Sequence, residues 1–408
     1  MIHSDTIIFG ILAAILGILF FLRQRGGVWD KVFTFVPIIL LAYLVPSLLV
    51  SFGVIDASES QLWTIAKDYF LTAALVLLTL SIDLRGILGL GPKALIMFFT
   101  ATIGIVIGGP IALWIVAQFE PSIIAGEGPE AAWRGFATLA GSWIGGGANQ
   151  TAMLEVYGYE IEQYGAMVAV DIVVANIWMA FLLYGAGMHE RIDRWLGADA
   201  SAITRLRDSM ANYSAQVEKV PSANELIVLA GFTFGAVAFA HWSAGWLSYY
   251  FTGALGAEAV LASEFFWVVV MATTLGLGAS FTKARELEGL GASKIGTVFI
   301  FLLVAVIGTK MDIFQLGDAP LFMAVGLIWM AIHSTLLLVT AKIVRAPFFF
   351  VAVGSKANVG GAASAPVVAG AFHPALAPVG VLLAVLGYAL GTYGAILCAE
   401  MMRAVSGG

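Results

Sequence analysis

The chain has 408 residues, of which 60% are hydrophobic and only 11% are charged, with a formal net charge of −6. A soluble domain carries about 25% charged residues, so this composition predicts an integral membrane protein surrounded by a lipid bilayer. No basic tail or block points to nucleic-acid binding, and the single cysteine, Cys398, excludes an internal disulfide.

Apolar segments long enough, or nearly long enough, to cross a bilayer recur along the whole chain, since a crossing helix needs about 20 residues. The hydrophilic segment 189–224 is expected to be a surface linker between an N-terminal half, 1–188, and a C-terminal half, 225–408. The prediction is an all-α membrane protein with 11 to 13 transmembrane helices. In chain order the segments are 6–22, 33–55, 69–82, 94–119, 135–154, 163–188, 226–250, 265–282, 295–309, 319–341, 346–371 and 375–399.

The two halves resemble each other at two places. "LLTLSIDLRGILGLGPKALIMFF" (77–99) is similar to "LLVAVIGTKMDIFQLGDAPLFMA" (302–324) when Asp83 is aligned with Asp312. Further along, "GSWIGGGANQTAM" (141–153) corresponds to "GSKANVGGAASAP" (354–366). Because both matches occur in the same order, they predict an internal duplication.

The glycine clusters in the second pair predict one broken helix in each half, near 135–157 and 346–371. Glycine weakens a helix by about 1 kcal/mol per residue, and unwound backbone cannot face lipid. Free carbonyls there can coordinate a cation, and half-helix N-termini can hold an anionic group. We therefore expect two discontinuous helices that cross and form one site. The alternative is close helix packing through small residues, as at Gly104 and Gly108.

Among the charged residues, Asp171 is the strongest candidate for a functional role, because it is the only charged residue between Gln163 and Met188. An ionisable group inside a membrane span is costly and is a functional candidate by default. The alternative is a structural acid satisfied by hydrogen bonds. Lys356 interrupts the second motif, where it can pair with Asp171, replace a coupling sodium, bind a substrate carboxylate or snorkel to an interface.

These motifs define two sets of expected site residues. The substrate is expected to contact Ser142, Asn149, Gln150, Thr151, Lys356, Asn358 and Ser364. A coupling sodium ion or proton is expected at Asp171 and Asn176, with the backbone of Gly146, Gly147, Gly360 and Gly361. No cofactor and no metal other than sodium is expected.

The motifs "GSWIGGGANQTAM" and "ANVGGAASAPVVAGAF" (357–372) resemble those of a bacterial membrane family catalogued as domain of unknown function 819. That family is grouped with the cation:proton antiporter and bile-acid:sodium symporter superfamily, and the resemblance covers nearly the whole chain. It implies two inverted repeats, a scaffold and a core with two crossing broken helices, and movement of the core against the scaffold. A homodimer in the bacterial inner membrane is also implied, but no substrate.

The segment count and the charges disagree about the orientation of the halves. Segments 69–82 and 295–309 are six segments apart, and an even separation gives parallel repeats. Basic residues should collect on the cytoplasmic side, and their positions instead make the halves inverted. We therefore expect the segment list to be wrong by one between residues 135 and 262. The basic loops are marked by Arg23, Arg25, Lys31, Arg85, Lys93, Lys283, Arg285, Lys294, Lys342 and Arg345.

The expected function is secondary active transport of a small polar organic solute, an organic anion, amino acid or short peptide, coupled to sodium or protons by an elevator-type motion. An ion channel is one alternative, although it usually builds its pore from a ring of equivalent groups. A membrane-embedded enzyme is the other, but the sequence has no Gly-x-Ser-x-Gly, no His-Glu-x-x-His and no adjacent acid pair in an apolar segment. We therefore expect no enzymatic activity.

Overall fold

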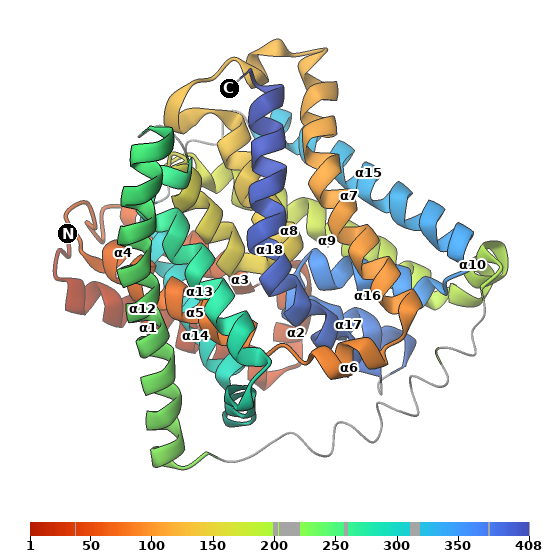
Figure 1. Ribbon diagram of the computed structural model, residues 1–408, viewed down its shortest axis with the longest axis horizontal. Coiled ribbons are helices and arrows are strands. Elements are labelled where there is room, and N and C mark those ends of the chain that lie inside the picture. Colours follow the sequence, from red (N-terminus) through yellow and green to blue (C-terminus); the bar gives the residue numbers. More distant parts are fainter. Residues whose placement is uncertain are drawn as a thin grey trace.

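Long apolar helices make up most of the protein in the computed structural model (Figure 1), which describes residues 1–36, 38–198, 203, 221–256, 260–310, 319–373 and 376–407. Seven helical stretches in these ranges are long and apolar enough to cross a membrane: Asp5–Arg25, Leu62–Leu80, Pro92–Ala117, Tyr164–Gly187, Ala223–Leu255, Pro320–Val344 and Ala377–Val405. Asp312 and most of the second half of the linker lie outside the described residues. The chain is thus an all-helical membrane protein over the ranges described.

The helices lie over the expected segments, because a long apolar run satisfies its backbone in lipid only as a helix. Fewer of the described helices are long and apolar enough to cross than the 11 to 13 expected: seven, or eight if the bent pair Glu264–Ser280 and Lys283–Leu290 is one span. The N-terminal half contains α1 (Asp5–Arg25), α2 (Val28–Phe35), α3 (Ile38–Ser51), α4 (Leu62–Ile65), η1 (Ala66–Leu71), α5 (Thr72–Leu80), α6 (Leu84–Gly89), α7 (Pro92–Ala117), α8 (Ala132–Tyr157), α9 (Tyr164–Gly187) and α10 (His189–Leu196). The C-terminal half contains α12 (Ala223–Leu255), α13 (Glu264–Ser280), η6 (Lys283–Leu290), α14 (Ala292–Gly308), α15 (Ala319–Val344), α16 (Phe348–Asn358), α17 (Gly361–Phe372) and α18 (Ala377–Val405).

The element α8 is a helical hairpin, which we call hairpin 1. Gly146 has φ 73° and ψ −170°, so the helix breaks there and reverses. The returning arm passes so close that a Cβ on Gly141 would lie 2.5 Å from the Asn149 carbonyl oxygen. At the base, the Trp133 and Tyr157 rings meet with centroids 5.5 Å apart. Hairpin 1 therefore begins and ends on the same side of the protein.

The helices α16 and α17 form a second hairpin, hairpin 2. It turns at Gly360 and Gly361, whose φ values are 110° and 60°. At its base the ring centroids of Phe349 and Phe372 lie 5.3 Å apart, so its two ends also meet. The amphipathic helix α10 packs at this base, where the Asp193 carboxylate accepts a hydrogen bond from the Phe348 N–H at 2.7 Å.

The expectation that the two broken helices traverse the membrane is therefore corrected. Both glycine clusters do interrupt helices, but each chain segment then turns back instead of continuing across. Hydropathy cannot distinguish the two cases, because both place apolar side chains at the same depth. The correction removes segment 135–154 from the list of crossings, within the interval 135–262 where an error of one was expected. The separation between 69–82 and 295–309 then becomes odd.

The helices pack as two groups that each draw on both halves of the chain. The first helix group contains α1, α3, α5, α12, α13 and α14, and the second contains α7, α9, α15, α18 and the two hairpins. Within each group the helices share extensive contacts, for example α8 with α18 and α12 with α13, whereas contacts between the groups are sparser. Figure 1 shows α12, α13 and α14 lying together on one side of α18. The helices α7, α15 and α16 lie on its other side.

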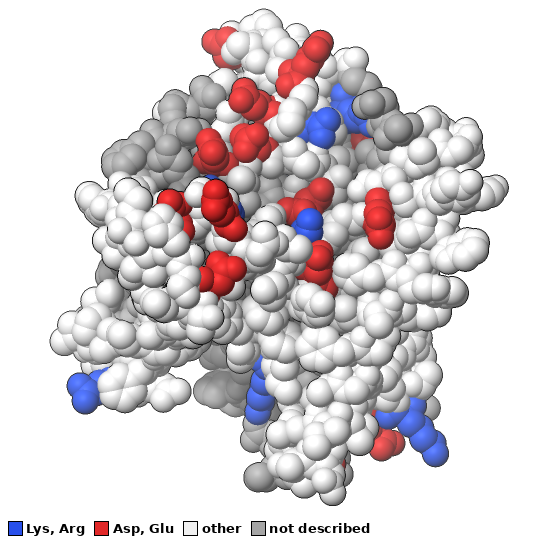
Figure 2. All heavy atoms as spheres, turned by 90° about the vertical axis from the view of Figure 1, so that its left-hand side faces the viewer, with Lys and Arg blue, Asp and Glu red and all other residues white. Residues whose placement is uncertain are grey.

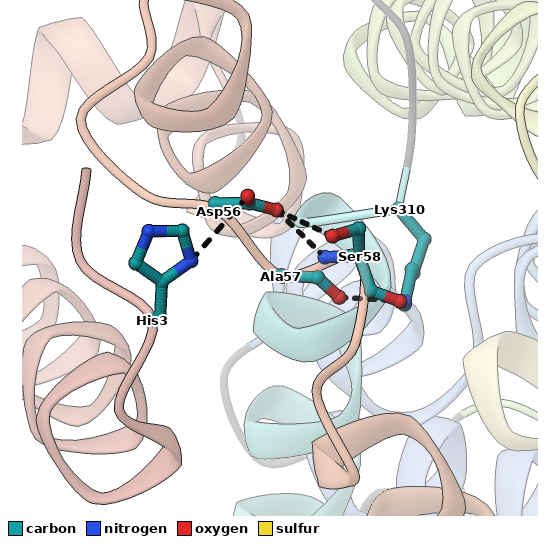
Figure 3. A network of polar contacts seen from close by, with 5 residues as sticks. All are labelled: His3, Asp56, Ala57, Ser58 and Lys310. Atoms are coloured by element: carbon teal, nitrogen blue, oxygen red, sulfur yellow. Dashed lines mark hydrogen bonds and ion pairs between the residues drawn. The ribbon is translucent and has the colours of Figure 1, made fainter.

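Charged side chains separate toward the two ends of the helices. Figure 2 shows mainly acidic side chains over the upper part of one face and basic side chains at its lower edge. At the acidic end, the carboxylate of Asp56 accepts hydrogen bonds from the Ser58 N–H and hydroxyl at 3.0 and 2.7 Å (Figure 3), and these hold the pKa of Asp56 below its ordinary value. Lys310 donates to the Ala57 carbonyl at 2.7 Å and thereby ties the end of α14 to this loop.

The hairpin topology predicts a pattern of labelling from the two sides of the membrane. Single cysteines at Glu130 and Glu162, which flank hairpin 1, should both react with an impermeant maleimide added from one side. Single cysteines at Lys342 and His373, which flank hairpin 2, should react only from the opposite side. Native Cys398 is 0% exposed and should contribute little background. If the residues flanking one hairpin react from opposite sides, that element crosses the membrane and the hairpin assignment is wrong.

Candidate functional site

The tips of the two hairpins converge on the middle of α18. A Cβ added to Gly146 of hairpin 1 would lie 3.7 Å from the Cε1 atom of Tyr388, and one added to Gly361 of hairpin 2 would lie 4.0 Å from the same atom. The glycines are required here because their backbone conformations are ones that side chains rarely allow. The structure thus brings together the two glycine clusters that the sequence singles out.

Asp171 of α9 is held by the first arm of hairpin 1. The Ser142 hydroxyl donates to Asp171 Oδ2 at 2.6 Å, and the Trp143 indole N–H donates to Oδ1 at 2.8 Å. Each carboxylate oxygen therefore has one fixed donor and keeps lone pairs for a further partner. The amide of Gln150, on the returning arm, also lies beside this carboxylate. Two arms of one hairpin thus orient a single acid inside the helical bundle.

Lys356 of hairpin 2 approaches the same helix. Its side chain is only 2% exposed, and its ammonium group donates to the Ala175 carbonyl at 3.1 Å, one helical turn beyond Asp171. Asp171 and Lys356 interact electrostatically with each other. A Cβ built on Gly360 would lie 3.2 Å from the Lys356 Nζ atom and 2.4 Å from the Ser364 hydroxyl. One acid and one base therefore lie next to the hairpin tips.

Several buried polar atoms near Asp171 and Lys356 lack a hydrogen-bond partner of good geometry. They are the hydroxyls of Tyr43 and Tyr164, the Gln150 amide nitrogen and the Ser364 hydroxyl. The rings of the two tyrosines lie with their centroids 6.2 Å apart, and both hydroxyls interact electrostatically with Asp171 without completing a hydrogen bond. Each unsatisfied buried polar group costs about 1–3 kcal/mol, so such a cluster favours a site that a ligand or water completes.

The two tyrosines were missed by the sequence interpretation. Tyr164 begins α9, and Tyr43 lies on α3, which belongs to the first helix group. A Cβ on Gly308 would lie 2.4 Å from the Tyr43 carbonyl oxygen, so close packing of α14 against α3 fixes this residue. A tyrosine within an apolar segment is a weak signal, since its ring is apolar and only its hydroxyl needs a partner. Tyr43 is the contribution of the first helix group to the site.

Two asparagines expected to contact the substrate instead fasten the hairpins to neighbouring helices. Asn149 accepts a hydrogen bond from Thr392 at 2.6 Å and donates to the Tyr388 carbonyl at 2.9 Å, both on α18. Asn358 accepts a hydrogen bond from Thr102 of α7 at 2.8 Å. Their amides are thus already satisfied by protein groups. Asn149 thus positions the tip of hairpin 1, and Asn358 positions the tip of hairpin 2.

The remaining sequence candidates lie in different surroundings. Asn176 is exposed and donates to the Ile172 carbonyl at 2.7 Å, so it is not brought to Asp171. Thr151 donates to the Gly147 carbonyl at 3.0 Å and lies beside Tyr164. Gly147 faces the first helix group, since a Cβ there would lie 3.5 Å from Ile300 of α14. Asp171, Lys356 and the hairpin tips thus define the candidate site.

Gly360→Ala is expected to destabilise the protein by about 1–3 kcal/mol, because a left-handed backbone and a clash with Ser364 both oppose the new methyl group. Gly370→Ala provides the matched comparison on the same hairpin, since a Cβ there meets nothing within 4 Å. Gly370→Ala should not lower the free energy of unfolding and can raise it by up to about 1 kcal/mol. Thermal unfolding of both purified variants in detergent measures the difference. If the Gly360→Ala and Gly370→Ala variants are equally stable, the turn at Gly360 accommodates a side chain and the prediction is wrong.

Comparison of the sequence with known proteins places this chain within a described family. The family model for "Protein of unknown function (DUF819)" matches residues 10–405, which is nearly the whole chain. The chain is also 24% identical over 349 residues to the "Uncharacterized membrane protein YjcL" of Bacillus subtilis (strain 168), covering 82% of each chain. The family match, over residues 10–405, includes both hairpins, Asp171 and Lys356. The chain therefore belongs to the membrane protein family described as protein of unknown function (DUF819).

Proposed function

We propose that the protein is a secondary active transporter that moves a small organic anion together with a coupling cation. The observation that carries this proposal is the convergence of two glycine-tipped hairpins beside one half-buried acid, Asp171, and one buried base, Lys356. Interrupted helices that meet inside a membrane protein are the arrangement in which transporters bind substrates and ions. The geometry supports a site that both helix groups enclose.

The anionic part of the substrate is assigned to the tip of hairpin 2. The N-terminus of α17 begins at Gly361, and a helix N-terminus carries a partial positive charge that attracts anions. Lys356 adds a full positive charge, and the buried Ser364 hydroxyl supplies an unpartnered donor. A carboxylate suits these groups. A phosphate ester is disfavoured, because bidentate recognition by arginine is the usual device for it and no arginine contacts these described residues.

The coupling cation is assigned to Asp171. Carboxylate, hydroxyl and amide oxygens are the ligands that hard cations prefer, and all three kinds lie around this residue. A proton carried on Asp171 would serve the same purpose. This places the cation and the anion on adjacent faces of α9 and hairpin 2, within reach of each other's electric field.

The expected superfamily relationship and the inverted repeat form part of the proposal. With hairpin 1 removed from the crossings, α14 is the fifth span after α5, so the two helices run in opposite directions. The basic residues at the same end of both halves, such as Lys93 and Lys342, agree with inversion and place that end in the cytoplasm. On this reasoning α7, α8 and α9 correspond to α15, α16–α17 and α18. We propose that the membrane is the cell membrane of a bacterium.

Transport is proposed to occur by an elevator-type movement of the second helix group against the first. The groups touch through few polar contacts, among them the Thr273–Thr392 hydrogen bond at 3.1 Å and the Lys67–Glu155 ion pair at 3.2 Å. The first helix group exposes aromatic side chains on α12, including Trp242, Trp246 and Tyr249. These suit an interfacial belt or the interface of a homodimer.

A thermal-shift screen of the purified protein tests the proposed function. Small carboxylates, neutral sugars, quaternary amines and phosphate esters are each added with and without sodium. A ligand that binds only the folded state stabilises by about 2.7 kcal/mol at 100 times its Kd. A carboxylate should give the largest shift, and the responding compound is then tested for saturable, ion-driven uptake into proteoliposomes. If only amines or phosphate esters stabilise the protein, the organic-anion assignment is wrong.

A further inference from the structure

The site contains two opposite charges that have no other strong partners. Asp171 receives hydrogen bonds from neutral donors, Ser142 and Trp143, and Lys356 donates to a neutral carbonyl. Buried His333, on α15, is satisfied by the Ala101 carbonyl at 3.1 Å and the Ser355 hydroxyl at 2.8 Å. Other described charges on these helices, such as Glu155 and Glu400, lie at the acidic end beside Lys67 and Arg403.

We infer that this charge pair fixes the stoichiometry as one monovalent cation per substrate of net charge −1, and so makes transport electroneutral. The inference rests on the proposed function and narrows its substrate class. In the empty site the charges of Asp171 and Lys356 sum to zero. Binding of the cation alone gives the site a net charge of +1, and binding of the anion alone gives −1. When both are bound, the net charge is zero again. Isolated charge is costly in a low-dielectric interior, so the singly occupied forms are the disfavoured ones.

The buried, unpartnered groups provide a place for the cation. The hydroxyl oxygens of Tyr43 and Tyr164 lie within electrostatic range of the Asp171 carboxylate, and rotation of the Gln150 amide by 180° would present its oxygen in place of its nitrogen. Carboxylate, amide and phenol oxygens together can replace the water around a sodium ion. If the cation is a proton, it resides on Asp171 and the same charge sum applies.

The pairing explains how two solutes could be coupled without touching each other. Only the empty and the doubly loaded site are neutral, so only these two forms are suited to crossing the apolar interior. A zwitterionic amino acid with a cation would leave +1 in the site. The inference therefore excludes zwitterions as substrates and favours monocarboxylates or peptides with one net negative charge.

The test removes Lys356 and needs no organic substrate. In Lys356→Gln the cation-loaded site becomes neutral, so the variant should exchange sodium across the membrane by itself. Proteoliposomes loaded with sodium are given external ²²Na⁺, and the exchange rate should exceed that of the wild type by on the order of 100-fold. A parallel arm with a trapped pH dye detects a proton leak instead. Lys356→Met, which keeps an unbranched and flexible side chain without the charge, is used if the glutamine variant fails to fold.

Two further variants make the result specific to the charge pair. Lys93→Gln makes the same substitution at an exposed lysine whose amine donates to the Arg345 carbonyl, and it should exchange no more cation than the wild type. Asp171→Asn combined with Lys356→Gln removes the cation site, so the leak should disappear again. If the Lys356 variants carry neither sodium nor protons, or if the double variant leaks equally, the inference is wrong.

The inference and the proposed function can fail separately. If the wild type concentrates an organic anion but an imposed membrane potential drives that uptake, the electroneutral stoichiometry is wrong and the transport function stands. If neither the wild type nor any variant moves an anion or a cation, both are wrong. Uptake that depends on the ion gradient and ignores the membrane potential supports both.

Discussion

Asp171→Asn is expected to lower concentrative, ion-driven uptake by about two to four orders of magnitude, because leaving the buried charge of Lys356 without its opposite partner costs about 3–5 kcal/mol. The substitution keeps the size of the side chain and leaves Lys356 as an unbalanced charge at the hairpin tips. The anion-loaded site of the variant is neutral, so exchange of labelled for unlabelled substrate should persist while uptake against a gradient is lost. Both fluxes are measured in proteoliposomes.

Asp56→Asn is the matched comparison, since Asp56 is a solvent-exposed acid held by Ser58 at the acidic end, away from the hairpin tips. It should take up substrate as the wild type does. Melting curves of both variants show whether either has lost its fold. Full uptake by Asp171→Asn, with its dependence on the ion unchanged, would remove Asp171 from the coupling mechanism.

The surface hollow at the acidic end has a different character from the hairpin site. It has a volume of about 490 Å³ and is lined by polar and charged residues that include His3, Asp5 and Asp56. Its side chains largely satisfy one another, as the Ser60 hydroxyl does by donating to Asp5 at 2.6 Å. The hairpin site instead leaves buried hydroxyls without partners, and it is the site where a ligand would gain most.

Much of the helical architecture could be predicted from the sequence, because lipid imposes one rule on every crossing segment. Segment 94–119 became α7 (Pro92–Ala117) and segment 226–250 became part of α12 (Ala223–Leu255). The direction of the chain after a break could not be predicted. Whether residues 147–157 continue or turn back is decided by contacts such as Trp133 with Tyr157, between residues 24 positions apart.

Some of the residues of the candidate site could likewise be predicted from the sequence and others could not. Asp171 and Lys356 could be recognised because a charge in an apolar segment is unusual whatever surrounds it. The roles of the amides could not, because an asparagine that binds a ligand and one that fastens a helix look alike in sequence. Asn149 is occupied by Thr392, a residue 243 positions away. Tyr43 gave no signal, since its importance arises only where α3 meets α9.

A disulfide between the two helix groups is expected to abolish transport, and its reduction should restore it. The Thr273 and Thr392 hydroxyls lie 3.1 Å apart, one on α13 and one on α18, so paired cysteines there place their sulfur atoms within bonding reach after a small adjustment. An elevator-type movement separates these residues, and a covalent bond of about 2.05 Å cannot stretch to follow it.

The matched pair Asp5→Cys and Ser60→Cys joins two parts of the first helix group, where the Ser60 hydroxyl donates to Asp5 at 2.6 Å. Because both positions move together in the proposed mechanism, their disulfide should leave uptake close to that of the reduced protein. Uptake into proteoliposomes is measured after oxidation with iodine and again after reduction, with the extent of cross-linking read from a thiol-labelling gel. The inter-group pair should lose uptake in proportion to the fraction cross-linked. Undiminished uptake by fully cross-linked Thr273→Cys/Thr392→Cys would mean that α13 and α18 stay together during transport, and the elevator-type movement of these two groups would be wrong.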